Sequence, residues 1–159
     1  MFEKIELKSP NIIYKDSFLE NINDYKESSN TEYFNIYKKA LDDFEQYVEI
    51  LDNNSKGIDL PKGYVPCSTF WLVNGDNKVL GVIRIRHKSI PLNGHIGYDI
   101  AQKYRGRGYG IKILELSLPI AKQLGIDKAI LSCESINIAS EKVIKANNGK
   151  IYNQFVISL

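Results

Sequence analysis

The sequence predicts an α+β fold in which helices pack on one β-sheet. Three patterns support this prediction: apolar residues with helical spacing in the first third, β-branched and aromatic runs in the middle, and alternating strands and helices towards the end. The chain has 159 residues, of which 43% are hydrophobic, and this suffices for the core of one domain. We therefore expect a single domain over residues 1–159.

Two helices are expected first. A weaker pattern covers Asp16 to Lys26, and a stronger one covers Thr31 to Leu51. Asn30 or Thr31 suits the N-terminal cap of the second helix, and polar residues followed by Gly57 suit its end. The apolar residues of the second helix recur every three or four positions and so share one face: Phe34, Tyr37, Leu41, Phe44, Val48 and Leu51.

Three strands follow a loop with two prolines, Leu60 to Pro66. β-branched and aromatic residues predict strands at Ser68 to Val73, Lys78 to His87 and His95 to Ile100. The Asn-Gly-Asp-Asn cluster at residues 74–77 suits a hairpin turn between the first two strands. These three strands are therefore expected to pair antiparallel.

The last third predicts a helix, a strand, a second helix and a final strand. The first helix covers Tyr109 to Leu124 and is closed by a glycine. Pro119 within it predicts a kink or an early end, because proline has no N–H group to donate. A buried strand is expected at Lys128 to Cys133, then a helix at Asn137 to Ala146 and a strand at Lys150 to Ile157.

Charge and composition exclude several classes of protein. The net charge of +2, from 21 basic and 19 acidic residues, is far from that of a dedicated nucleic-acid binder. No apolar run approaches the length of a membrane span, and the N-terminus is charged, so we expect a cytoplasmic protein without a membrane partner. The two cysteines, Cys67 and Cys133, belong to no paired motif, so no metal site is expected.

A glycine-rich turn leads from the strand ending at Ile100 into the next helix. Glycines allow positive φ and close approach of a ligand, and the unpaired N–H groups at a helix start attract anions. The two arginines of the turn, with Lys103 and Lys112 beside it, add positive charge. The turn therefore predicts a pyrophosphate site. Its residues are Tyr104, Arg105, Gly106, Arg107, Gly108, Tyr109 and Gly110.

Two other phosphate-binding motifs do not fit this turn. A P-loop needs Lys and Ser or Thr after its last glycine, whereas Gly110 is followed by Ile111 and Lys112. The dinucleotide fingerprint needs its third glycine one residue later. Two alternatives remain: a turn that only joins strand to helix, and an Arg-Gly segment that contacts RNA.

The turn resembles the acetyl-CoA loop of the GNAT superfamily, written Gln/Arg-x-x-Gly-x-Gly/Ala, with Arg105, Gly108 and Gly110 at its defined positions. Gly97 to Ile100 resembles the fourth strand of that family, and Asn137 to Ser140 resembles the start of its last motif. The resemblance implies a GNAT-like mixed, mostly antiparallel central sheet with helices on both faces. It also implies an N-acetyltransferase that moves the acetyl group of acetyl-CoA, as co-substrate, to a primary amine.

The resemblance further implies where coenzyme A binds. In this family pantetheine lies in a gap beside the end of the fourth strand, and no metal takes part. Asn137 has an alternative role as a helix cap. The residues implied in cofactor binding are Ile100, Ala101, Arg105, Gly106, Arg107, Gly108, Tyr109, Gly110, Asn137 and Ser140.

The catalytic groups are less uniform. The N–H group of Ile100 is the candidate oxyanion donor. His95 stands near the position of the family's base, and an unperturbed histidine pKa near 6.5 suits proton acceptance at neutral pH. His87 is the second choice, and a histidine that only faces solvent is the alternative for His95.

The family's general acid is a tyrosine, but Ile144 stands at that position. Tyr98 or Tyr109 is a candidate replacement, and solvent protonation of the thiolate is another. A non-enzymatic acyl-CoA-binding protein of the same fold is therefore the alternative function.

The chain offers one strand after Lys150 where the family has two. We therefore expect that the last C-terminal strand is missing, or that a homodimer completes the sheet by exchange of the C-terminal strand. The acceptor is not identified by any motif, and a small-molecule amine is favoured. Arg84 and Arg86 share one strand face, where they either attract a carboxylate of the acceptor or point into water.

Overall fold

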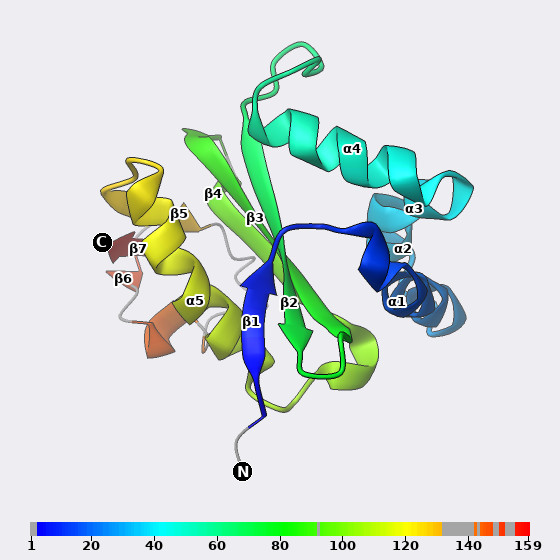
Figure 1. The fold of residues 1–159 in the computed structure, drawn as a ribbon. Coiled ribbons are helices and arrows are strands. Elements are labelled where there is room, and N and C mark those ends of the chain that lie inside the picture. Colours follow the sequence, from blue (N-terminus) through cyan, green and yellow to red (C-terminus); the bar gives the residue numbers. More distant parts are fainter. Residues whose placement is uncertain (1–2, 92, 132–141, 143, 148–149, 152–154) are drawn as a thin grey trace.

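The sheet orders the whole chain. The computed structural model describes residues 3–91, 93–131, 142, 144–147, 150–151 and 155–159. These residues form one seven-stranded sheet in the order β1-β2-β3-β4-β5-β7-β6, with helices on both faces (Figure 1). Neighbouring strands are antiparallel, except β4 and β5, which are parallel. The predicted α+β fold with a mixed, mostly antiparallel sheet is confirmed.

The three predicted central strands form with small changes at their ends. The side chain of Asn74 accepts hydrogen bonds from the N–H groups of Asp76 and Lys78, which fixes the predicted hairpin turn. An additional edge strand, β1, pairs with β2; four residues are too few for a sequence pattern to reveal it. The strands are β1 Ile5–Lys8, β2 Cys67–Asn74, β3 Val79–Ile90, β4 Gly94–Ile100, β5 Lys128–Leu131, β6 Lys150–Ile151 and β7 Phe155–Ser158.

The prediction of one helix from Thr31 to Leu51 is wrong, because the segment forms three helices. Asp43 is extended, with φ of −152°, and its side chain accepts a hydrogen bond from the N–H group of Gln46. A new helix therefore begins there. The apolar spacing continues across the break, so periodicity alone could not show it. The helices are α1 Lys15–Glu27, α2 Thr31–Tyr37, α3 Lys39–Asp42, α4 Phe44–Ser55 and α5 Tyr109–Gln123.

Helix α5 continues through Pro119 to Gln123, so the early end predicted there is wrong. Proline removes the hydrogen bond to the carbonyl group of Glu115. Both residues are exposed, so water can satisfy that carbonyl. The predicted closing glycine, Gly125, follows with a φ of 87°.

Each face of the sheet has its own core. On one face α5 packs its Ile113 and Leu114 against the strands. On the other, helices α1 to α4 pack on Trp71, whose ring stacks on Phe18 at 4.4 Å between centroids. Figure 1 shows α5 and helices α1 to α4 on opposite sides of the strands. The sheet therefore separates two layers of helices.

The C-terminal segment corrects two predictions. A single strand over Lys150 to Ile157 is wrong, because β6 and β7 pair with each other and β7 also pairs with β5. The expectation of a missing last strand is wrong for the same reason, since the hairpin forms within one chain. The hydrophobic pattern of two strands this short does not distinguish them from one longer strand. Strand β6 is the outer strand of the described sheet, and a homodimer formed by exchange of the C-terminal strand stays a prediction.

The predicted helix from Asn137 to Ala146 lies largely outside the described residues. Of its residues, Lys142 and residues 144–146 are described, and these are helical. The buried side chain of Ile144 belongs to the core on the α5 face. None of the described helices is long and apolar enough to cross a membrane.

Candidate active site

A cavity of about 590 Å³ lies where the end of β4 meets the glycine-rich turn, with α2 opposite. Its volume is in the usual range for a small-molecule site. All residues of the turn except Arg107 contribute to its wall. The wall is formed by Asn30, Glu32, Tyr33, Tyr98, Asp99, Ile100, Tyr104, Arg105, Gly106, Gly108, Tyr109, Gly110, Ile111 and Lys142.

The turn has the geometry of an anion site. Gly106 and Gly108 have φ of 76° and 84°, values that disfavour any side chain, and a Cβ atom at either would meet nothing within 4 Å. The N–H group of Lys112 makes the first bond of α5, to the carbonyl of Gly108. Within the described chain, the N–H groups of residues 109–111 have no backbone acceptor. These amides lie at the positive end of the helix dipole and can receive a pyrophosphate.

Arg105 fastens the turn to the rest of the site. Its Nε atom donates to the carbonyl oxygen of Ile100 at 2.9 Å. Its guanidinium group lies over the rings of Tyr25 and Tyr33, at 6.0 and 5.7 Å from their centroids. Arg105 was predicted to contact the cofactor directly. The contact with the cofactor stays a prediction, and the structure shows that Arg105 ties the turn to α1 and α2.

The end of β4 presents open backbone groups to the cavity. Ala101 donates its N–H group to the carbonyl of Leu80 at 2.8 Å, which sets the phase of the β3–β4 ladder. Alternation along an antiparallel ladder then turns the N–H group of Ile100 away from β3. In the register of the described residues, β5 pairs with Gly94 and Ile96 only. Among the described residues, no strand pairs with β4 beyond Ile96 on the side of the cavity.

The two predicted backbone contacts of the cofactor differ in this respect. Ile100 has the open N–H group described above. Ala101 has both backbone groups engaged, because its carbonyl oxygen accepts a hydrogen bond from the N–H group of Tyr104 at 2.8 Å. Its side chain lies in a neighbouring small pocket with Tyr25 and Asp99. Ile100 is thus the better placed of the two.

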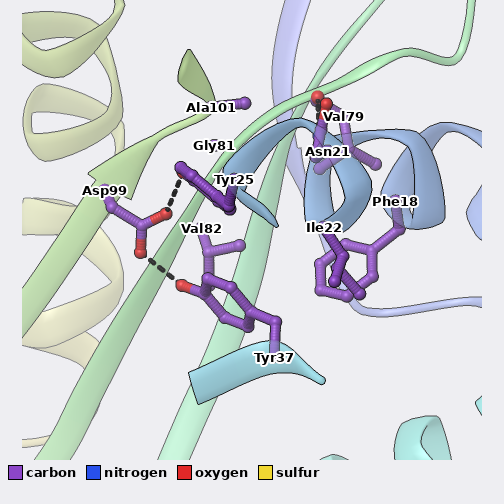
Figure 2. A pocket seen from close by; sticks show the side chains of 10 residues that line it. All are labelled: Phe18, Asn21, Ile22, Tyr25, Tyr37, Val79, Gly81, Val82, Asp99 and Ala101. Atoms are coloured by element: carbon purple, nitrogen blue, oxygen red, sulfur yellow. Dashed lines mark hydrogen bonds between the residues drawn. The ribbon is translucent and has the colours of Figure 1, made fainter. Parts of the chain in front are cut away.

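A buried carboxylate lies at the end of β4, and sequence reasoning missed it. Asp99 is 5% exposed and accepts a hydrogen bond from the hydroxyl group of Tyr25 at 2.9 Å. It accepts a second bond from the hydroxyl of Tyr37, and Figure 2 shows the two rings converging on the carboxylate. Arg84 Nη1 lies 3.5 Å from Asp99 and donates to the Tyr37 hydroxyl at 2.7 Å. The one signal in the sequence that could have indicated this carboxylate was a charged residue between two residues of a strand.

The protonation states of this cluster follow from burial and charge. Burial, and next the carboxylate of Asp99, raise the pKa values of Tyr25 and Tyr37 above their ordinary value. Both hydroxyl groups therefore stay protonated and donate. Burial lowers the pKa of Arg84, but Tyr37 and Asp99 raise it by more, so the guanidinium stays charged. The cluster thus joins α1, α2, β3 and β4 through charged hydrogen bonds.

The predicted base is held by the sheet. The Nδ1 atom of His95 accepts a hydrogen bond from the N–H group of Ile130 on β5, at 3.1 Å. Nδ1 is therefore unprotonated, and in the neutral ring the proton lies on Nε2. Burial lowers the pKa of His95 from 6.5. His87, the second choice, has Nε2 at 2.8 Å from Ser68 Oγ.

The remaining predicted residues differ in their placement. Tyr98 lines the cavity, which suits a candidate acid. Tyr109 also lines the cavity, but its hydroxyl group donates to Glu3 at 2.9 Å. Asn137 and Ser140 lie outside the described residues. Over the part of the chain that is described, no group of side chains could hold a metal ion.

The site fits an acyl carrier with a pyrophosphate and an extended arm. Open amides and positive charge suit the pyrophosphate, and the edge of β4 beside the cavity suits the extended arm. Both lead into the same cavity.

Comparisons with known proteins agree with this fit. A family model described as an acetyltransferase (GNAT) domain matches residues 19–150. No curated protein matches the sequence.

Several solved structures share the fold. One is the acetyl transferase from Salmonella typhimurium that modifies the N-terminal serine of a 50S ribosomal subunit protein; it has 15% identity and a TM-score of 0.64, over 98% of this chain and 95% of that chain. A second is the microcin self-immunity acetyltransferase MccE, solved with acetyl-CoA and AMP; it has 16% identity and a TM-score of 0.67, over 98% and 93%. A third is the PaiA N-acetyltransferase from Thermoplasma acidophilum, solved with coenzyme A; it has 14% identity and a TM-score of 0.62, over 96% of each chain.

The family match covers most of the chain, and it includes the strand, the turn and the helix that form the cavity. The chain therefore belongs to the GNAT family of acetyl-CoA-dependent acyltransferases.

Proposed function

We propose that this protein transfers the acetyl group of acetyl-CoA directly to a primary amine of a small molecule. The observation that carries the proposal is the meeting of the open amides of α5 and the open edge of β4 at one cavity. The amides of residues 109–111 would bind the pyrophosphate, with positive charge from Arg107. The edge of β4 that faces the cavity would orient the extended arm. Bound acetyl-CoA supplies an activated thioester at the end of this arm.

The N–H group of Ile100 is the proposed donor to the oxyanion. Acyl transfer places negative charge on the carbonyl oxygen, and a fixed backbone donor stabilises that charge without having to reorganise. The peptide of Ile100 is held on both sides. The side chain of Asp99, the residue before Ile100, accepts hydrogen bonds from two tyrosines. The carbonyl oxygen of Ile100 itself accepts hydrogen bonds from Tyr25 at 3.2 Å and from Arg105 at 2.9 Å.

His95 is proposed as the base, and Tyr98 as the acid. Because His95 does not line the cavity, it would take the proton of the amine through intervening water. Proton acceptance at Nδ1 requires that His95 release the N–H group of Ile130. His95→Asn keeps an acceptor near the place of Nδ1 but cannot take a proton. We expect this variant to lower kcat by about 100-fold or more with unchanged affinity for acetyl-CoA. An unchanged kcat would restrict His95 to a role in holding β5.

A panel of amines tests the proposed function. Purified protein is mixed with acetyl-CoA and small primary amines, and free thiol is measured as coenzyme A is released. Peptides with free N-terminal serine form a second arm, because one similar structure is an enzyme that modifies such a residue. Turnover with small amines and not with peptides supports the proposal. Tight binding of acetyl-CoA without turnover in either arm would favour the acyl-CoA-binding alternative.

A further inference from the structure

Two arginines converge on a glycine of β4. Arg84 and Arg86 lie two residues apart on one face of β3, and Arg84 pairs with Gly97 in the register. A Cβ atom on Gly97 would lie 3.8 Å from Nη2 of Arg84 and 3.9 Å from Nη1 of Arg86. Since Gly97 has no side chain, both guanidinium groups lie directly over this strand, at ordinary contact distance from the place of a Cβ atom. Cys67 pairs with Arg86 on the other side, from β2.

The charges of the two arginines are balanced differently. Arg84 lies 3.5 Å from the carboxylate of Asp99 and donates to the hydroxyl of Tyr37. Arg86 has a buried Nη1 atom that no hydrogen-bond acceptor among the described residues contacts. Burial lowers the pKa of Arg86; the other groups that act on it are the thiol of Cys67 and the cation of Arg84, and neither is a carboxylate. A guanidinium that is partly removed from water without a counter-charge is costly, unless a bound anion supplies the charge.

The position of this cation relates it to the acetyl group. Gly97 and Asp99 lie on the face of β4 that meets α1 and α2, whereas the thioester is proposed to lie near Ile100. Gly97 and Ile100 are three positions apart along an extended strand, which corresponds to about 10 Å. An anion beside Arg86 would therefore lie about one short aliphatic chain away from the reacting amine. Asp99 and its two tyrosines lie between, and all three are already engaged with each other.

We propose that Arg86, with Gly97 beside it, forms a subsite for an anionic group, carboxylate or phosphate, of the acceptor. The acceptor is then a small amine that carries this anionic group about 10 Å from its amino group. This inference rests on the proposed function and narrows its substrate class. Arg86 acts as a specificity-determining residue, while Arg84 holds the Asp99 cluster.

Binding is measured first, because it does not depend on turnover. The protein is saturated with coenzyme A, which occupies the pyrophosphate turn and cannot donate an acetyl group. It is then titrated calorimetrically with ω-amino carboxylates of increasing length, and with alkylamines of the same lengths. We expect one range of lengths to bind at least about tenfold more tightly as the amino carboxylate than as the alkylamine. Arg86→Gln should abolish this difference, and Arg86→Lys should retain part of it.

Lys88→Gln is the matched control, because it removes the same charge from an exposed position of the same strand. It should leave the preference unchanged, and thermal unfolding checks that each variant is folded. Equal binding of the two series by the unaltered protein, or an equal preference in Arg86→Gln, overturns the proposal. Failure of the proposed function would appear separately, as no heat with coenzyme A or no turnover of any amine. In either case, comparing the binding of amino carboxylates with that of alkylamines still tests the role of Arg86.

Discussion

The hydroxyl group of Tyr37 donates to the buried carboxylate of Asp99 and accepts a hydrogen bond from Arg84, so one side chain of α2 joins β3 and β4. Tyr37 is 3% exposed, and its ring also lies against Phe18. Helix α2 has only seven residues and depends on such contacts. The position of this wall of the site therefore depends on a polar cluster as well as on apolar packing.

Removal of this hydroxyl group should destabilise the protein. Tyr37→Phe leaves Asp99 and Arg84 each with one partner fewer in a buried place. We expect the free energy of unfolding to fall by about 1.5–3 kcal/mol, measured by urea denaturation. Tyr64→Phe serves as control, since Tyr64 is 69% exposed, and should change stability by less than about 0.5 kcal/mol. Equal effects of the two variants would show that the cluster contributes little.

A side chain at Gly108 should weaken binding of coenzyme A. Gly108→Val forces a left-handed φ on a branched residue and places bulk before the open amides of α5. We expect the Kd for coenzyme A, measured by calorimetry, to rise by about tenfold or more.

Gly125→Val is the matched control for this experiment. Gly125 has nearly the same φ, 87° against 84°, and equal open space, but lies beyond the other end of α5. The two variants should lose similar stability, and only the change at Gly108 should affect the Kd. A similar loss of affinity in both would point to backbone strain and away from a binding role of the turn.

Replacement of Pro119 should stabilise the protein. Pro119→Ala restores an N–H group that can donate to the carbonyl of Glu115 within α5. The gain in helix propensity exceeds the loss from a more flexible unfolded chain, so we expect about 1–2 kcal/mol of added stability. The urea midpoint would rise with an unchanged slope. A lower midpoint would mean that α5 is shaped around the proline.

The stability of the protein should depend on pH through His95. Its pKa is lowered in the folded state, so below about pH 6.5 the unfolded state binds a proton that the folded state resists. The contribution of His95 to the free energy of unfolding is therefore fully present above pH 6.5. It is lost as the pH decreases towards the folded-state pKa. His95→Asn should flatten this dependence between about pH 5.5 and 7, as measured by denaturation at several pH values. An unaltered slope would assign the dependence to other groups, such as His87, whose pKa is also lowered by burial.

Local chemistry made the turn from Tyr104 to Gly110 predictable from the sequence. Positive φ at two glycines and unpaired amides at a helix start follow from residues that are neighbours along the chain. The central strands and α1 were predictable for the same reason, because their hydrophobic periods are local. The break at Asp43 was not, since a cap interrupts the backbone without disturbing the apolar spacing.

Only the tertiary structure decided how distant residues share their polar groups. Tyr25 and Asp99 are 74 residues apart, and the partner of His95 lies on β5, 35 residues away. Such pairs form when strands and helices are already in register, so no local pattern encodes them. The Nη1 atom of Arg86, which has no acceptor within the described ranges, became visible in the same way. A missing partner of this kind can be recognised only after neighbours from other strands and helices have been placed.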